Sequence, residues 1–172
     1  MKNIQTKSKL LFNYWLVAEK IIGCILLLWS IFVIASILSV VSSMIRYGYI
    51  AAGNTSLSSI AIENHLIIII SILCLSGSWM LLFRNRTGWI LCTVSSLIYG
   101  INLLLSSRSK AVDSSLTFAE HYKSYGFAAL LFFIIFLLLL LKPIRTRYHP
   151  SAKTWIIISG IILLCILDKI IF

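Results

Sequence analysis

Five ionisable residues fall in the two polar segments that precede the second and fourth long apolar runs of this chain. They are Glu63, His65, Asp113, Glu120 and His121. Imidazoles and carboxylates of this kind can bind a divalent metal or relay protons. Their spacing matches no ligand motif such as HxxxH or HExxH, and acids near a helix start also complement its dipole. The pattern predicts an outer-face polar cluster, with Asp168 as a further member, and neither a metal nor a cofactor.

Asp168 is unusual because it lies inside the last apolar run, shortly before the end of the chain. Counted from Trp155 at about 1.5 Å per helical residue, its carboxylate lies ~20 Å into a hydrocarbon core of ~30 Å. An ionisable residue at such a depth is a functional hypothesis by default. The alternative is that the last helix stops short or tilts, so that Asp168 and Lys169 reach the outer headgroups.

The four cysteines each stand alone inside an apolar run, and the chain has no CxxC pair. They are Cys24, Cys74, Cys92 and Cys165. Disulfide frameworks and zinc sites need grouped cysteines, so these thiols are interpreted as small packing residues. The chain also lacks a Gly-rich phosphate loop, a GxSxG elbow, paired intramembrane aspartates and mid-span histidines for haem. No catalytic residue is predicted, and no motif points to a known family.

Small residues recur at four-residue spacing on two of the apolar runs. The third run carries Gly88, Cys92, Ser96 and Gly100, and the first carries Ala35, Ser39 and Ser43. In lipid, such stripes let helix backbones approach closely and form hydrogen bonds through serine. Internal packing of the first three spans is the favoured interpretation, and docking of a partner's helix is the alternative.

Basic residues mark the connections on one side of the predicted bundle. Those expected to hold anionic lipid headgroups are Arg84, Arg86, Lys142, Arg145 and Arg147. A cation beside the inner leaflet is attracted by its negative surface potential, which makes lipid anchoring the simplest interpretation.

Five apolar runs approach the ~20 residues with which a helix crosses a core of about 30 Å. They cover residues 21–45, 66–83, 88–105, 122–141 and 154–172. None alternates as a barrel strand would. Only residues 84–87 separate the second and third runs, which predicts a tight antiparallel hairpin. We therefore expect an all-α, polytopic membrane protein, a compact bundle of about five transmembrane helices forming one domain over residues 1–172.

The distribution of charge predicts the orientation of this bundle. With five spans, one side carries ten of the fifteen Lys and Arg residues and a single acid, Glu19, whereas the other carries five cations and four acids. The basic side should face the cytoplasm, which places the N-terminus inside and the C-terminus outside. Trp15, Trp89 and Trp155 lie at the basic ends of spans, as expected of an aromatic belt at the membrane interface.

The composition restricts the class of protein. Residues are 60% hydrophobic and 12% charged, with a mean hydropathy of +1.01, whereas soluble domains are near 45–50% apolar and about 25% charged. The net charge of +10 resides in short connections beside the bilayer, so nucleic acid is not an expected partner. The compact loops and the Ile- and Lys-rich composition favour a bacterial inner membrane.

Three functions are compatible with these features. A non-enzymatic accessory, assembly or immunity-type subunit, acting through helix contacts with a membrane protein partner, is favoured because mid-membrane polar groups are few. A small transporter or channel, formed by a homo-oligomer, is the first alternative, although such proteins use polar or broken helices near the midplane. A membrane-embedded enzyme is the second and would depend on the outer carboxylates and histidines.

Overall fold

The computed structural model describes residues 2–47, 57–113 and 118–171, with side chains over 14–47, 64–105 and 126–167. This described part is helical and contains no strand. The long helices are α1 (Lys2–Arg46), α2 (Leu57–Leu82), α3 (Arg86–Asp113), α4 (Phe118–Leu140) and α6 (Ala152–Ile171). A short helix, α5 (Lys142–Arg145), and a 3-10 turn, η1 (Thr146–Tyr148), connect α4 to α6. The predicted all-α fold class is therefore confirmed.

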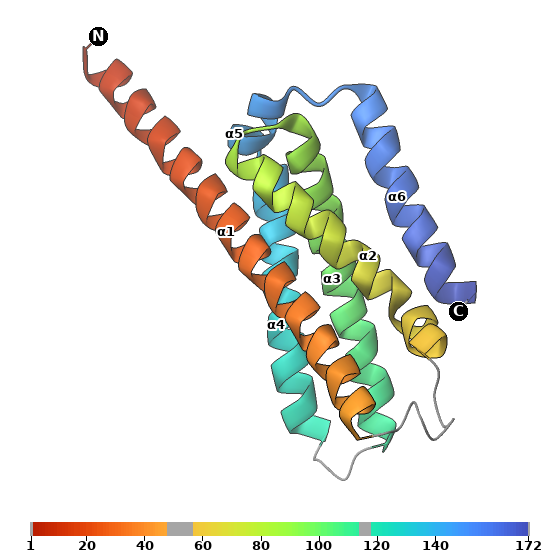
Figure 1. Ribbon diagram of the computed structural model, residues 1–172. Coiled ribbons are helices and arrows are strands. Elements are labelled where there is room, and N and C mark those ends of the chain that lie inside the picture. The colour runs from red at the N-terminus through yellow and green to blue at the C-terminus, as the bar shows by residue number, and fades with distance from the viewer. Residues whose placement is uncertain (1, 48–56, 114–117, 172) are drawn as a thin grey trace.

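The helices form a bundle in which α1 and α6 lie at the periphery (Figure 1). Helices α2, α3 and α4 lie side by side, α1 crosses this group and projects beyond it, and α6 stands at the side, where it contacts α3. The turn between α2 and α3 and the connection from α4 to α6 lie together at what we call the basic end. The start of α1 lies toward this end and the end of α6 lies at the opposite end.

The apolar helices are those of a multi-pass membrane protein. Three segments are long and apolar enough to cross a bilayer: Tyr14–Arg46, Asn64–Leu82 and Arg86–Leu105. A fourth results if Gly126–Leu140 and Lys142–Tyr148, bent by 55° relative to each other, are counted as one span. The apolar part of α6, Ala152–Leu167, is shorter. Three or four spans are thus supported, and a total of five, like the orientation, stays a prediction.

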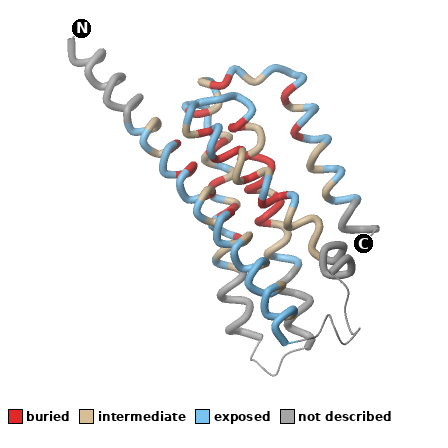
Figure 2. The backbone as a smooth tube through the Cα atoms, viewed as in Figure 1, coloured by how far each residue is buried: buried red, intermediate tan, exposed pale blue. Residues whose placement is uncertain are grey.

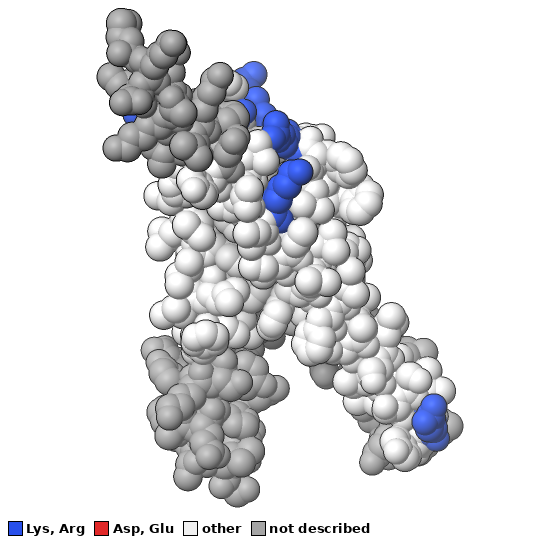
Figure 3. Space-filling model, turned by 90° about the vertical axis from the view of Figure 1, so that its left-hand side faces the viewer, with Lys and Arg blue, Asp and Glu red and all other residues white. Residues whose placement is uncertain are grey.

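The surface shows the same division between apolar middle and basic end. On the α1 side of the molecule, Lys and Arg gather near the basic end and at the opposite tip, with an uncharged surface between them (Figure 3). This uncharged middle surface suits the hydrocarbon layer of a bilayer, because an unpaired charge inside lipid is costly.

The helices extend further than the apolar runs suggested. Helix α1 begins at Lys2, although the first run begins at residue 21, and α3 continues to Asp113, although the third run ends at residue 105. Hydropathy marks only the part of a helix that fits in lipid. Once a helix has formed, its backbone hydrogen bonds continue through the polar flanks, so the helices extend beyond the apolar runs.

The predicted hairpin between α2 and α3 is present, and local hydrogen bonds explain its sharp turn. Arg84 takes a left-handed conformation (φ 58°). Its N–H donates to the Leu81 carbonyl, and the Asn85 N–H donates to the Met80 carbonyl, each at 2.9 Å, which is the hydrogen-bond pattern of a Schellman C-cap. The Asn85 side chain then accepts the Thr87 N–H at 3.0 Å and caps the start of α3.

Two glycines let the arms of this hairpin touch. A Cβ on Gly88 would lie 2.4 Å from the Leu81 backbone nitrogen, and one on Gly77 would lie 2.7 Å from the Leu91 Cβ. Neither distance is compatible with a side chain. Close approach of backbones is how helices associate in lipid, where no hydrophobic force drives them together.

Helix α1 is attached to the bundle along only part of its length. Its buried residues are Glu19, Ile22, Gly23, Leu26 and Ser30, which follow the i, i+3, i+4, i+7 spacing of one helical face. From residue 31 to residue 47 it has no buried residue. Figure 2 shows this change from buried to exposed along the helix.

An aromatic group joins three helices near the middle of the bundle. The ring centroids of Trp29 and Phe132 lie 5.1 Å apart, as do those of Tyr99 and Phe132. The rings of Trp29 and Tyr99 meet edge to face at 6.5 Å. These spacings lie within the range that aromatic pairs prefer, so the group links α1, α3 and α4.

Candidate functional site

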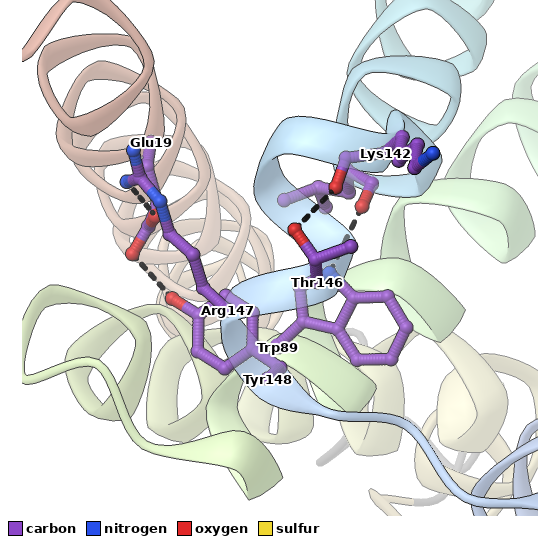
Figure 4. Close-up of polar contacts among 7 residues, drawn as sticks. Glu19, Trp89, Lys142, Thr146, Arg147 and Tyr148 are labelled. Atoms are coloured by element: carbon purple, nitrogen blue, oxygen red, sulfur yellow. Dashed lines mark hydrogen bonds and ion pairs between the residues drawn. The ribbon is translucent and has the colours of Figure 1, made fainter. Parts of the chain in front are cut away.

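A buried acid at the basic end is the centre of a polar contact that joins distant parts of the chain. Glu19 on α1 is only 3% exposed. Its Oε2 lies 3.1 Å from Arg147 Nη1, and its Oε1 accepts the hydroxyl of Tyr148. Both partners come from the α4–α6 connection (Figure 4). The carboxylate therefore fastens α1 to a segment more than 120 residues away along the chain.

The same contact continues into α3 and α4. The ring of Tyr148 stacks on Trp89 with centroids 5.8 Å apart and planes 14° from parallel. The Trp89 Nε1–H donates to the Leu139 carbonyl at 2.9 Å, which satisfies one of the carbonyls left open where α4 ends. We call Glu19, Trp89, Arg147 and Tyr148 the basic-end junction. It joins α1, α3, the end of α4 and η1 at one point.

Local sequence explains why the connection folds back in this way. Pro143 occupies the first turn of α5, where its missing N–H is harmless. Ile144 and Tyr148 are the apolar residues of an otherwise basic segment, and both are buried against the bundle. His149 then adopts a left-handed conformation (φ 43°) that ends η1 before Pro150.

A second polar contact fixes the start of α6. Arg86, at the first position of α3, donates through Nη2 to Ser151 Oγ at 2.9 Å and also to Thr154 Oγ1. The Ser151 N–H donates to Thr154 Oγ1 at 3.2 Å. The α2–α3 turn is thereby joined to α6, which has few other contacts with the bundle.

The bundle interior holds a group of hydroxyls and thiols at the interface of α2 and α3. The hydroxyls of Ser71 and Tyr99 lie 2.7 Å apart. Ser78 donates to the Cys74 carbonyl at 2.6 Å, and the thiols of Cys74 and Cys92 each lie 3.9 Å from its hydroxyl. All five side chains are buried. We call this set the intramembrane polar cluster.

The polar atoms of both groups bond mainly within the protein. The acceptors of Glu19 are occupied by Arg147 and Tyr148, and the hydroxyls of the intramembrane polar cluster bond to each other or to helix carbonyls. Within the ranges described, no three His, Cys, Asp or Glu side chains are grouped so that they could share a metal ion. Both groups are suited to joining helices.

Most of the predicted outer-face cluster lies outside the side chains that the structure describes. This applies to Glu63, Asp113, Glu120, His121 and Asp168. His65 is described, and it is half-buried on α2 beside a cavity toward the end opposite the junction. Whether these residues gather is therefore a prediction that stays open.

The two predicted small-residue stripes have different surroundings. On α3, Gly88, Cys92, Ser96 and Gly100 are buried; Gly88 and Cys92 meet α2, and a Cβ on Gly100 would meet the ring of Phe133 on α4. On α1, Ala35, Ser39 and Ser43 are exposed. Internal packing among the first three spans therefore uses the α3 stripe but not the α1 stripe, because α1 attaches through its earlier face.

The predicted lipid-binding cations also divide into two groups. Arg147 pairs with Glu19, and Arg86 bonds to Ser151 and Thr154. Arg84 and Lys142 are exposed, and Arg145 is half-buried. Trp89, expected in an interfacial belt, lies at the basic end but does not face the headgroups. Its side chain is fully buried because the α4–α6 connection folds over it.

Sequence reasoning gave no role to Glu19 or Tyr148. One signal was available for Glu19, because it is the single acid among the ten cations of the basic side. If such an acid becomes buried, it needs a cationic or hydrogen-bonding partner. The partner could not be chosen, because nothing local shows that the α4–α6 connection folds back.

No known protein family, curated protein or solved structure matches this chain.

Proposed function

We propose that the chain is an accessory subunit that docks a transmembrane helix of a partner along the distal half of α1. The observation that carries this proposal is a set of small exposed residues on that half. They are Ala35, Ser36, Ser39, Ser42 and Ser43. We call this set the α1 docking stripe.

The stripe differs from surfaces that face hydrocarbon. The exposed residues of α4 are bulky and apolar, among them Phe127, Leu130 and Leu137. Serine gains little from lipid, whereas at a helix–helix contact it permits close approach and adds hydrogen bonds. The stripe therefore favours a helix as its neighbour.

The hydroxyl oxygens of the α1 docking stripe can accept hydrogen bonds from such a helix. Ser36 donates to the Phe32 carbonyl at 2.8 Å and Ser43 donates to the Ser39 carbonyl at 2.9 Å. Each donor is thereby satisfied within α1, and each oxygen keeps acceptor capacity for a partner's donor. Ser36 and Ser43 are seven residues apart, about two helical turns, so both acceptors lie on one face of α1 and can meet the same partner helix.

Site-specific photo-crosslinking in the native host tests the proposal. A diazirine-bearing aliphatic amino acid, close to leucine in size, replaces Ser39 in one variant and Leu137, on the exposed face of α4, in the matched control. We expect a discrete protein adduct from position 39 and none from position 137, because only the stripe faces a partner. In a third variant, with the crosslinker at Ala35, Ser39→Phe should reduce the adduct by about tenfold if the bulky ring removes ~1.4 kcal/mol of association free energy.

Two outcomes would contradict the proposal. Equal adducts from positions 39 and 137 would mean that neither face is specific. An adduct at twice the chain mass of 19.4 kDa would mean that the stripe pairs with a second copy, as a homo-oligomeric transporter or channel would require.

A further inference from the structure

Two adjoining cavities lie between α6 and the α2–α3 hairpin, on a different surface from the α1 docking stripe. Their volumes are about 290 and 190 Å³, and both are lined by Leu66, Ile98 and Cys165. The larger one adds Asn102, Leu105 and Ile166 and further isoleucines. Leu105 and Ile166 are 42% and 41% exposed, so the recess opens on the side of the bundle, where lipid would lie.

The lining is apolar except at one level. Asn102 presents an amide to the larger cavity, and His65 lines the smaller one. The Asn102 amide makes no hydrogen bond to any residue that the structure describes. An amide that faces an apolar recess without a partner is unfavourable. A ligand with a hydrogen-bond acceptor at this position would remove that cost.

The depth of Asn102 and His65 in the bilayer indicates which group of a ligand would accept the hydrogen bond. Asn102 lies three residues before the apolar run 88–105 gives way to Ser106, Ser107 and Arg108, and His65 directly precedes the apolar run 66–83. At 1.5 Å per residue, both are within about 5 Å of the end of their segments. This is the boundary between hydrocarbon and headgroups, where the ester carbonyls of a glycerolipid lie.

A helix would fit this recess poorly. Helices associate in lipid through small residues that let backbones approach. The cavity lining is instead formed by large branched side chains, including Ile101, Ile162 and Ile166. A thin, flexible hydrocarbon chain can follow such a surface, whereas a rigid helix cannot.

We infer that this recess binds an ester-linked glycerophospholipid of the leaflet opposite the basic end. One acyl chain fills the apolar cavities between α3 and α6, and the Asn102 amide donates a hydrogen bond to an ester carbonyl. The lipid would support α6, which is otherwise attached mainly at its start through Arg86, Ser151 and Thr154.

Photolabelling in phosphatidylcholine nanodiscs tests the inference. A phosphatidylcholine that carries a diazirine midway along one acyl chain is included as probe, and labelled residues are mapped by mass spectrometry. We expect labels to concentrate on the deeper lining of the recess, on α3 between Val94 and Ile98 and on α2 between Ile69 and Leu73, because the middle of an acyl chain lies deeper than its ester carbonyl. The exposed face of α4 between Phe127 and Leu137 reports the background from annular lipid.

Cavity-filling variants provide the decisive comparison. Ile162→Trp should reduce labelling of α3 about fivefold or more, equivalent to losing ~1 kcal/mol of binding. Ile157→Trp, on the exposed side of the same helix, should leave it unchanged. Leu105→Trp closes the recess from its exposed rim and keeps the test valid if Ile162→Trp does not fold.

Competition between lipids tests whether an ester carbonyl accepts the hydrogen bond of Asn102. Unlabelled diacyl phosphatidylcholine should displace the probe about fivefold better than the dialkyl ether analogue, since one neutral hydrogen bond contributes ~1 kcal/mol. Asn102→Leu should abolish this difference. Labels spread evenly over all exposed faces, no effect of either tryptophan, or protection of the recess by a co-purifying protein would each overturn the inference.

Discussion

The two halves of α1 differ in how they meet the rest of the protein. Between Glu19 and Ser30, one face of the helix is buried. Glu19 forms an ion pair with Arg147 and a hydrogen bond with Tyr148, whose ring stacks on Trp89. From residue 31 to Arg46 the helix has no buried residue, and small hydroxyl residues lie on its surface beside bulky ones such as Phe32 and Leu38. The proximal half is attached to the bundle through buried residues, whereas the distal half is at most half-buried and carries the proposed docking stripe.

This difference follows from the solvent. In lipid, apolar side chains gain nothing by leaving hydrocarbon, so a bulky apolar face cannot hold helices together. Specific contacts have to do so, and they are concentrated near the basic end. They are the close approach at Gly77 and Gly88, the basic-end junction, and the bonds of Arg86 to α6.

The largest expected effect comes from breaking the basic-end junction. Glu19→Ala leaves the Arg147 guanidinium, whose side chain is 17% exposed, without its carboxylate and leaves the Tyr148 hydroxyl without its acceptor. Losing one partner of a buried pair costs about 3–5 kcal/mol. The midpoint of SDS-induced unfolding, followed by circular dichroism, should fall accordingly.

The neighbouring residue supplies the control for this prediction. Lys20→Ala removes an exposed charge from the same turn of α1 and should change stability by no more than about 0.5 kcal/mol. If both variants unfold at the same SDS fraction, the junction does not fasten α1, and the contrast between the halves of the helix is lost.

A smaller effect is expected where α2 and α3 touch. In Gly88→Ala the new Cβ would lie 2.4 Å from a backbone nitrogen and 2.6 Å from a backbone carbon. Backbone cannot move aside as a flexible side chain does, so the hairpin must open, at a cost of about 1–3 kcal/mol. Thermal unfolding in detergent measures this loss.

Gly160→Ala is the matched variant, because a Cβ there meets nothing within 4 Å. It should stabilise α6 by roughly 0.5–1 kcal/mol, since alanine favours the helix. Equal responses of the two variants would show that close approach at Gly88 does not determine the stability of the hairpin.

Sequence reasoning found what depends on local pattern. The apolar runs predicted the long helices, and four residues between two runs predicted the hairpin, because hydropathy and connection length act within a short stretch of chain. The two stripes were also visible, but their spacing is the same whether a face is buried, as at Cys92, or exposed, as at Ser39. Burial depends on which helix comes alongside.

The junction could not be predicted for the same reason. It depends on a bend at Leu141 that directs a basic segment back across the end of the bundle. Arg147 and Arg145 are indistinguishable as residues of a basic connection, yet only Arg147 reaches Glu19 among the contacts of the described chain. A pairing across such a separation is set by the tertiary fold and leaves little local signal.

The smallest predicted effect concerns the intramembrane polar cluster. Tyr99→Phe removes one hydroxyl, while Ser71 still donates to the Ile67 carbonyl at 2.6 Å. Stability should fall by only about 0.6 kcal/mol, the average for hydrogen bonds between membrane helices.

Ser71→Ala should cost more, roughly 1–3 kcal/mol, because it leaves the Tyr99 hydroxyl buried without that partner. Tyr14→Phe, at an exposed ring, provides the baseline. A double-mutant cycle in SDS unfolding that gave no coupling between positions 71 and 99 would show that this hydrogen bond adds nothing to the attachment of α2 to α3, which would then depend on the close approach at Gly77 and Gly88.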